Sequence, residues 1–164
     1  MAMPAHMYVT GTRQGFIAGS CDLRGREDSI LVEEFDHHVH IPNDPQSGLP
    51  TGKRVHKPLT ICKFFDKASP KLYQALVTGE RMGNVRIDWY RITPAGEEEL
   101  YFQHTLEDAI VISIKPYMPN CLDATKEQFQ HMENVSFTYR KIIWTWVPDG
   151  IESQDDWKVP GAGA

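Results

Sequence analysis

The sequence has little cysteine, no surplus of basic residues and no long apolar run. Its three cysteines, Cys21, Cys62 and Cys121, are widely spaced in 164 residues and form no C-x-x-C pair. An odd number of scattered cysteines favours a reducing compartment over a disulfide-bonded fold. No stretch approaches the ~20 apolar residues that a membrane helix needs, so we expect no membrane insertion.

Basic residues are fewer than acidic ones. Seventeen Lys and Arg against 22 Asp and Glu leave a net charge of −5 at pH 7. Binding to nucleic acid relies on a basic face that neutralises phosphates, so this balance argues against a nucleic-acid partner. Residues 1–10 lack a basic n-region and an uninterrupted apolar h-region. We therefore expect no signal peptide, synthesis in the cytoplasm, and any export by a route that ignores signal peptides.

Motifs for catalysis, cofactor binding or metal binding are missing as well. Thr51-Gly52-Lys53 lacks the upstream glycine and the following Ser or Thr of a phosphate-binding loop, and no G-x-S-x-G elbow occurs. His38 and His40 share a strand face beside Asp36, but a third ligand and a supporting shell are not evident. We expect no catalytic residue, no cofactor and no metal, and hence no enzyme.

Two alternatives stay open at this point. A cysteine-dependent hydrolase would need Cys62 or Cys121 activated by a histidine, although buried cysteine mostly behaves as a small apolar residue. A carbohydrate-binding β-sandwich module would stack sugars on exposed indole rings. The candidates for that role are Trp89, Trp144, Trp146 and Trp157.

Apolar residues alternate with period two along most of the chain, which predicts half-buried β-strands. The pattern covers residues 30–41, 55–61, 85–90, 100–114, 135–139 and 142–146. In the 100–114 run, Leu106, Ile110 and Ile112 are expected on one face. A slip of phase predicts a bulge near residues 140 and 141, and Pro58 predicts an edge or a bulge in its own strand.

One helix is expected within residues 68–79. Ser69 is a suitable N-cap, Pro70 suits the first helical position and Gly79 suits a left-handed closing residue. Its apolar stripe consists of Leu72, Ala75 and Leu76.

Two stretches lack any period. Residues 42–52 form a Pro/Gly-rich loop longer than a tight hairpin needs, and loops of this length are usually functional or disordered. Residues 117–131 read as a second loop with one helical turn near residues 126–129. The whole predicts one domain over residues 1–164, with a frayed tail over 158–164. Its fold class is mainly β: a β-barrel of two sheets flanked by one short α-helix, with a long extended loop.

Ordered motifs along the chain point to a known family. They are Glu34-Phe35-Asp36-His37, a Pro/Gly-rich pattern from Pro42 to Pro58 that includes Arg54 and His56, residues 66–76, Trp89-Tyr90-Arg91, Asp108-Ala109, residues 135–144 and Asp155-Asp156-Trp157. With these motifs the sequence resembles the haemolysin-coregulated protein (Hcp) family, the inner-tube proteins of bacterial type VI secretion. Residues 20–28 depart from it, being shorter than the glycine-containing loop of many members.

The resemblance implies a structural role. Six copies would form a ring, and rings would stack head to tail into a tube. The tube would carry the spike protein VgrG at its end, lie inside a contractile sheath, and hold small effector proteins in its lumen. Sheath contraction would expel it from the cytoplasm into the medium or a target cell. The chain stops soon after Trp157, so no C-terminal toxin domain is expected.

The loop at residues 42–52 is the candidate functional segment. Its three prolines lower the entropic cost of holding one extended shape. The resemblance implies that it projects toward the neighbouring ring. We expect the ring-stacking contact from Pro42, Asn43, Asp44, Pro45, Gln46, Ser47, Gly48, Pro50 and Gly52.

Overall fold

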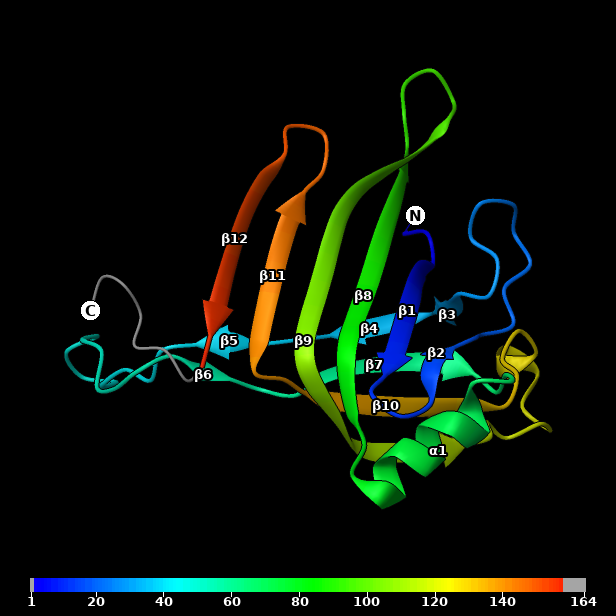
Figure 1. The fold of residues 1–164 in the computed structure, drawn as a ribbon, viewed down its shortest axis with the longest axis horizontal. Helices are drawn as coiled ribbons and strands as arrows, with labels where there is room; N and C mark the ends of the chain where they lie inside the picture. Colours follow the sequence, from blue (N-terminus) through cyan, green and yellow to red (C-terminus); the bar gives the residue numbers. More distant parts are fainter. Residues whose placement is uncertain (1, 158–164) are drawn as a thin grey trace.

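Strands make up most of the fold, and α1 packs at one end of them (Figure 1). The structure is a computed structural model that describes residues 2–157, so the tail expected to fray at 158–164 lies outside the described residues. In chain order the elements are β1 (Ala5–Gly11), β2 (Gly15–Ile17), β3 (Ile30–Val32), β4 (Glu34–Asp36), β5 (Val39–His40), β6 (Val55–His56), β7 (Leu59–Phe64), α1 (Ser69–Thr78), β8 (Arg81–Ile92), β9 (Glu98–Tyr117), the 3₁₀ turn η1 (Ala124–Lys126), β10 (Met132–Thr138), β11 (Lys141–Trp146) and β12 (Ile151–Asp156).

Strand β9 organises the large sheet, which contains ten of the twelve described strands. It pairs with β8 along one side, and with β10 and then β11 along the other. The change of partner falls at Asp108, whose φ is 54°, opposite the break between β10 and β11. The irregularity expected near residues 140 and 141 is therefore found as a break between two strands. Pro58 lies between β6 and β7.

The short strands β3 and β4 link the two ends of this sheet. β3 pairs with β1, β4 pairs with β7, and the N–H of Glu33 between them donates to the carbonyl of Cys62 at 2.8 Å. Residues 30–36 thus let the sheet curl back on itself without one uninterrupted ladder. The mainly β fold with one short α-helix is confirmed for the described residues. The barrel-like curl is made by one large sheet, and the second sheet contains only β5 and β6.

The apolar core draws on both parts of the curled sheet and on α1, and includes Met7, Ile61, Leu72, Ile87, Leu106, Phe137 and Ile142. Along β9 the buried residues change from even-numbered to odd-numbered positions, from Leu106 to Ala109 and Val111, because the backbone kinks at Asp108. Ile112 is 43% exposed, so its predicted place on the face of Leu106 is wrong. Local alternation could not reveal a kink that shifts the register in mid-strand.

Helix α1 has the predicted apolar stripe and the predicted end. Leu72 and Ala75 are buried, and Gly79 adopts a left-handed φ of 67° that closes the helix. The predicted N-cap is wrong, because the helix begins at Ser69 itself. The side chain of Asp66 accepts the N–H of Ala68 at 3.0 Å instead. None of the helices formed by residues 2–157 has the length and apolar character to cross a bilayer.

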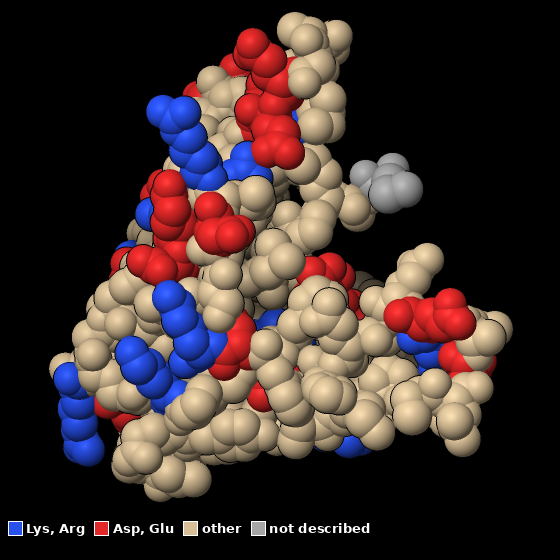
Figure 2. Space-filling view, turned by 90° about the vertical axis from the view of Figure 1, so that its right-hand side faces the viewer, with Lys and Arg blue, Asp and Glu red and all other residues tan. Residues whose placement is uncertain are grey.

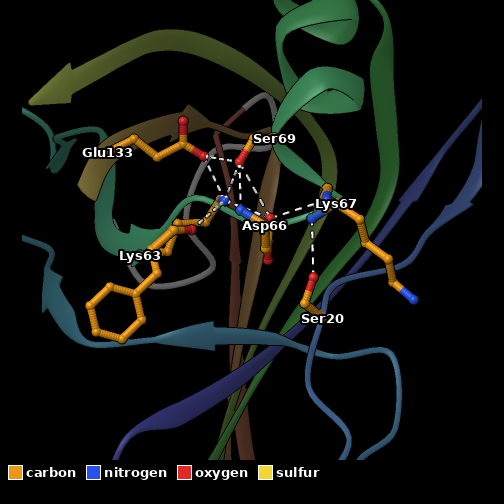
Figure 3. A network of polar contacts seen from close by, with 8 residues as sticks. Ser20, Lys63, Asp66, Lys67, Ser69 and Glu133 are labelled. Atoms are coloured by element: carbon orange, nitrogen blue, oxygen red, sulfur yellow. Dashed lines mark hydrogen bonds and ion pairs between the residues drawn. The ribbon is translucent and has the colours of Figure 1, made fainter. Parts of the chain in front are cut away.

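Ser69 is diverted into a buried ionic network (Figure 3). The ammonium of Lys63, which has no exposed surface, lies 2.5 Å from Glu133 Oε1, 2.8 Å from Asp66 Oδ1 and 2.9 Å from Ser69 Oγ. A buried charge is tolerated only when its hydrogen-bonding groups are satisfied. The network therefore joins β7, β10 and the start of α1. The nearby loop is attached by the N–H of Lys67, which donates to Ser20 Oγ at 3.1 Å.

Candidate assembly loop and its anchor

The loop at residues 42–52 projects past β5 and β6 at one end of the molecule, coloured cyan to teal in Figure 1. Its two arms pair with each other. The N–H of Thr51 donates to the carbonyl of Pro42 at 2.8 Å, the N–H of Asp44 donates to the carbonyl of Leu49 at 2.9 Å, and Asn43 and Pro50 form a bridge. The segment is therefore a hairpin-like projection rather than an irregular connector.

Asp44 holds the tip of the projection. Its carboxylate accepts the N–H of Gln46 at 3.0 Å and the hydroxyl of Ser47 at 2.9 Å, and its carbonyl accepts the N–H of Gly48 at 2.8 Å. Gly48 has a φ of 71°, a conformation that glycine adopts without strain. The hydrogen bond from the Gln46 backbone holds the pKa of Asp44 below its ordinary value. The tip is thus shaped by its own hydrogen bonds.

The projection exposes apolar side chains. Leu49 is 65% exposed at its tip and Ile41 is 53% exposed at its base. The nine residues expected to make the stacking contact lie together here, exposed or half-exposed. A rigid projection with an uncovered leucine suits contact with another protein surface.

Five polar side chains hold the base of the loop, and we call them the anchor cluster: His37, Arg54, His56, Tyr139 and Asp155. On one arm, Arg54 Nε lies 2.7 Å from Asp155 Oδ2, and Arg54 Nη2 donates to the carbonyl of Asp156 at 2.8 Å. His56 Nε2 lies 2.5 Å from the same Asp155 oxygen. Arg54 holds the pKa of Asp155 below its ordinary value, which keeps this carboxylate ionised at neutral pH.

Tyr139 connects the two arms of the loop. Its hydroxyl lies 2.7 Å from His56 Nδ1 and 2.7 Å from His37 Nε2, and His37 precedes the loop whereas His56 follows it. The hydroxyl is buried, and burial raises the pKa of Tyr139 and lowers the pKa of His37. Tyr139 is therefore a neutral donor and acceptor at neutral pH, and one phenol positions both arms.

Sequence reasoning did not single out the anchor cluster as a site. Its members appear only inside the family-like motifs, and about a hundred residues separate Tyr139 and Asp155 from the histidines they bind. Neither periodicity nor local spacing carries a signal for such a contact. The Arg54-x-His56 spacing was the available local hint, because residues two apart in an extended segment lie on the same side.

The cysteines give no support to a hydrolase. Cys62 Sγ lies 3.3 Å from the hydroxyl of Tyr117, and burial raises the pKa of Cys62, which keeps it as the less nucleophilic thiol. Cys121 is exposed. Cys21, which was not among the nucleophiles considered from the sequence, lies 3.8 Å from His6 Nδ1. Burial lowers the pKa of His6, which makes this histidine a weaker base.

The histidines and tryptophans considered as metal or sugar ligands pack against other side chains instead. His38 and His40 stack with centroids 4.8 Å apart, and residues 2–157 contain no group of three or more His, Cys, Asp or Glu placed to hold a metal. Trp89 packs on Phe35 at 4.9 Å and donates its indole N–H to His104. Trp144 packs against the core. The four tryptophans therefore do not form a common exposed platform for a sugar.

A second exposed apolar surface lies on the segment between β9 and β10, coloured yellow on the side of Figure 1 away from the loop. Met118, Leu122 and Phe129 are 61%, 90% and 53% exposed there. Tyr117, Met118 and Phe129 help to line a hollow of about 400 Å³. Figure 2 shows charges of both signs interspersed on this side of the molecule, with acidic residues gathered toward its upper end. The molecule thus offers uncovered apolar surface at two separate places.

The chain is similar to known proteins over nearly its whole length. The family model described as "Type VI secretion system effector, Hcp" matches residues 6–146. The "Major exported protein" of Pseudomonas aeruginosa is 51% identical over an alignment of 172 positions, gaps included. The alignment covers 99% of this chain and all of the relative.

Solved structures agree with the sequence comparison. One described as "Crystal structure of Hcp protein" matches with a TM-score of 0.89 and 36% identity, over 96% of this chain and 99% of the other. "Secreted protein Hcp3 from Pseudomonas aeruginosa" matches with a TM-score of 0.80 and 43% identity, over 96% of this chain and all of the other. The chain therefore belongs to the Hcp family, and it is a secreted tube protein of type VI secretion rather than an enzyme.

Proposed function

We propose that this chain assembles into six-membered rings that stack head to tail, with residues 42–52 making the contact between rings. The observation that carries the proposal is the pre-organised projection that exposes Leu49. A loop already held by internal hydrogen bonds loses little conformational entropy on binding, so more of its contact energy remains as affinity.

Repetition makes a small contact sufficient. Burying one leucine side chain stabilises a contact by about 2 kcal/mol. Six copies of the contact at each junction would make stacking strong although each copy is weak alone. Both kinds of contact, within a ring and between rings, are heterologous, since the two partners use different surfaces. Contacts between neighbours within a ring close after six copies, whereas the stacking contacts repeat without closing and give an open tube.

The remaining partners follow from the family. We propose that the stacked rings carry the spike protein VgrG at one end, lie inside a contractile sheath, and hold small effector proteins in the lumen. Assembly takes place in the cytoplasm, and contraction expels the tube without a signal peptide. The names of two similar proteins, "Major exported protein" and "Secreted protein Hcp3", support the export step. Residues 1–164 act as one domain in this role.

Replacing residues 44–50 by a Gly-Ser linker of equal length tests the stacking loop. The core strands are untouched, so the variant should fold and form rings, but it should not form tubes and should be lost from the culture supernatant. Sedimentation velocity separates rings from tubes. Leu49→Ser should also weaken stacking. Val77→Ser, which changes an apolar residue on α1 that is exposed to a similar extent, should stack and be secreted like the parent. Normal stacking and secretion of the linker variant would show that the loop is only a connector.

A further inference from the structure

The hydroxyl of Tyr139 has two hydrogen-bond partners in the anchor cluster but only one proton. His56 Nδ1 and His37 Nε2 each lie 2.7 Å from the hydroxyl oxygen. One imidazole must therefore accept the phenol proton, and the other must donate to the phenol oxygen.

When both histidines are neutral, Asp155 decides which histidine donates to Tyr139 and which one accepts its proton. Its ionised carboxylate lies 2.5 Å from His56 Nε2, so that nitrogen carries the proton and His56 Nδ1 is left as an acceptor. Tyr139 then donates to His56 Nδ1, and His37 Nε2–H donates to Tyr139. Every hydrogen bond from Asp155 through His56 and Tyr139 to His37 then has one donor and one acceptor.

The cluster can accommodate one additional proton but not two. When His56 is protonated, its Nδ1–H donates to Tyr139, and the phenol proton turns to a His37 whose Nε2 has become the acceptor. When His37 is protonated as well, both imidazoles donate and the phenol proton loses its acceptor within the cluster. Two positive rings then face each other across one buried oxygen. Both the unsatisfied phenol proton and the repulsion between the rings disfavour this state.

We propose that the anchor cluster is a proton-controlled latch: when both His37 and His56 are protonated, the base of the loop at residues 42–52 separates from Tyr139. The effect on stacking rests on the proposed function, but the effect on the order of the loop does not.

Charged neighbours set the response. His37 has Asp36 and His38 beside it and His56 across Tyr139, and burial is the main reason that the pKa of His37 is lowered. Asp155 contacts both His56 and Arg54 through the same carboxylate oxygen. The ring of Trp157 packs on His56, Arg140 pairs with Asp156, and His104 lies close enough to His37 for the two rings to interact electrostatically.

The sign of the response follows from the lowered pKa of His37. A histidine whose pKa is lower in the latched state binds protons more strongly in the open state. Opening is therefore favoured as the pH falls below the ordinary histidine value of about 6.5. The loop should be held at pH 7.5 and released toward pH 5.

Hydrogen exchange of the full-length protein tests the latch. Exchange by mass spectrometry, corrected for the intrinsic pH dependence of amide exchange, would follow peptides covering residues 38–57 from pH 7.5 to 5.0. We expect protection there to fall by up to about tenfold per pH unit for each proton taken up on opening. Peptides from the central part of β8 and β9 report global unfolding, so the latch predicts that residues 38–57 lose protection at pH values where these core peptides still exchange slowly.

Variants separate the latch from general loosening by acid. His37→Gln can still donate to Tyr139 but cannot be protonated, so its ratio of protection between pH 7.5 and 5.0 should approach one. His38→Gln is the matched control, because His38 stacks on His40 rather than bonding to Tyr139, and it should retain the acid response. Tyr139→Phe removes the shared hydroxyl and should expose residues 38–57 at every pH.

Two results would overturn the latch: protection of residues 38–57 that is independent of pH in the parent protein, or an acid response that survives in His37→Gln. Neither result bears on stacking, which the linker variant tests separately. If the linker variant stacks normally while the parent loop still opens in acid, the stacking function fails and the latch stands.

Discussion

Lys63 shows how a single side chain can hold distant elements together. Its ammonium is completely buried and touches carboxylates from β10 and from the residues before α1. Glu133 Oε2 has no hydrogen-bond partner among residues 2–157, so the carboxylate is held through Oε1, by Lys63 and by the hydroxyl of Ser69. Removing one member of such a network leaves an uncompensated buried charge, which is costlier than removing all members together.

Lys63→Met should therefore destabilise the fold by about 3–5 kcal/mol. Adding Glu133→Leu to Lys63→Met should recover part of the loss. Lys67→Met is the matched control, because Lys67 is exposed and its pair with Asp28 is worth less than about 1 kcal/mol. Urea unfolding at pH 7.5 measures all three. Equal effects of Lys63→Met and Lys67→Met would refute the assigned role of the network.

His104 should make stability depend on pH. It accepts the indole N–H of Trp89 at 2.8 Å, and burial lowers the pKa of His104 to about 4. Because the folded pKa lies below the unfolded value of about 6.5, the stabilisation is complete above pH 6.5 and is lost as the pH falls toward 4. The loss approaches about 1.4 kcal/mol per pH unit within that window.

Urea unfolding of the parent and of His104→Gln at pH 7.5 and 5.0 measures this contribution. The parent should lose more stability than the variant on acidification, and His131→Gln, an exposed histidine, should behave like the parent. An unchanged acid loss in His104→Gln would contradict the assignment.

At the scale of elements, α1 depends on its buried stripe. Leu72 is fully buried, whereas Val77 on the outer face is 75% exposed. Leu72→Ala should cost about 2–5 kcal/mol, and Leu72→Asp should prevent soluble folding because it buries an unpaired carboxylate. Val77→Asp should change the free energy of unfolding by less than about 0.5 kcal/mol. Soluble expression and urea unfolding distinguish these outcomes, and a folded Leu72→Asp ring would show that the stripe is not buried.

The same helix shows what a sequence can predict. Its stripe and its glycine end depend on residues within a few positions of one another, and both were predicted. Its N-cap was not, because the hydroxyl of Ser69 bonds to Glu133, 64 positions away. In β9 the alternation was predicted, but the positive φ of Asp108 shifts which residues are buried at the point where β9 changes its pairing partner. No local pattern in the sequence marks that point. The anchor cluster was missed for the same reason as the N-cap.

At the scale of the whole molecule, uncovered apolar surface on the projecting loop and on the segment between β9 and β10 fits a subunit whose surfaces are completed by its neighbours. The length, prolines and position of the loop were read from the sequence together with the family motifs. Its internal hydrogen bonds and its two-armed attachment to Tyr139 became visible only in three dimensions.

Negative-stain electron microscopy of the purified full-length protein, beside the variant with residues 44–50 replaced, tests whether the loop stacks the rings. We expect six-membered rings for both proteins, and rings joined end to end only for the parent. Compact monomers of the parent protein, or end-to-end stacks of the variant as long as those of the parent, would contradict it.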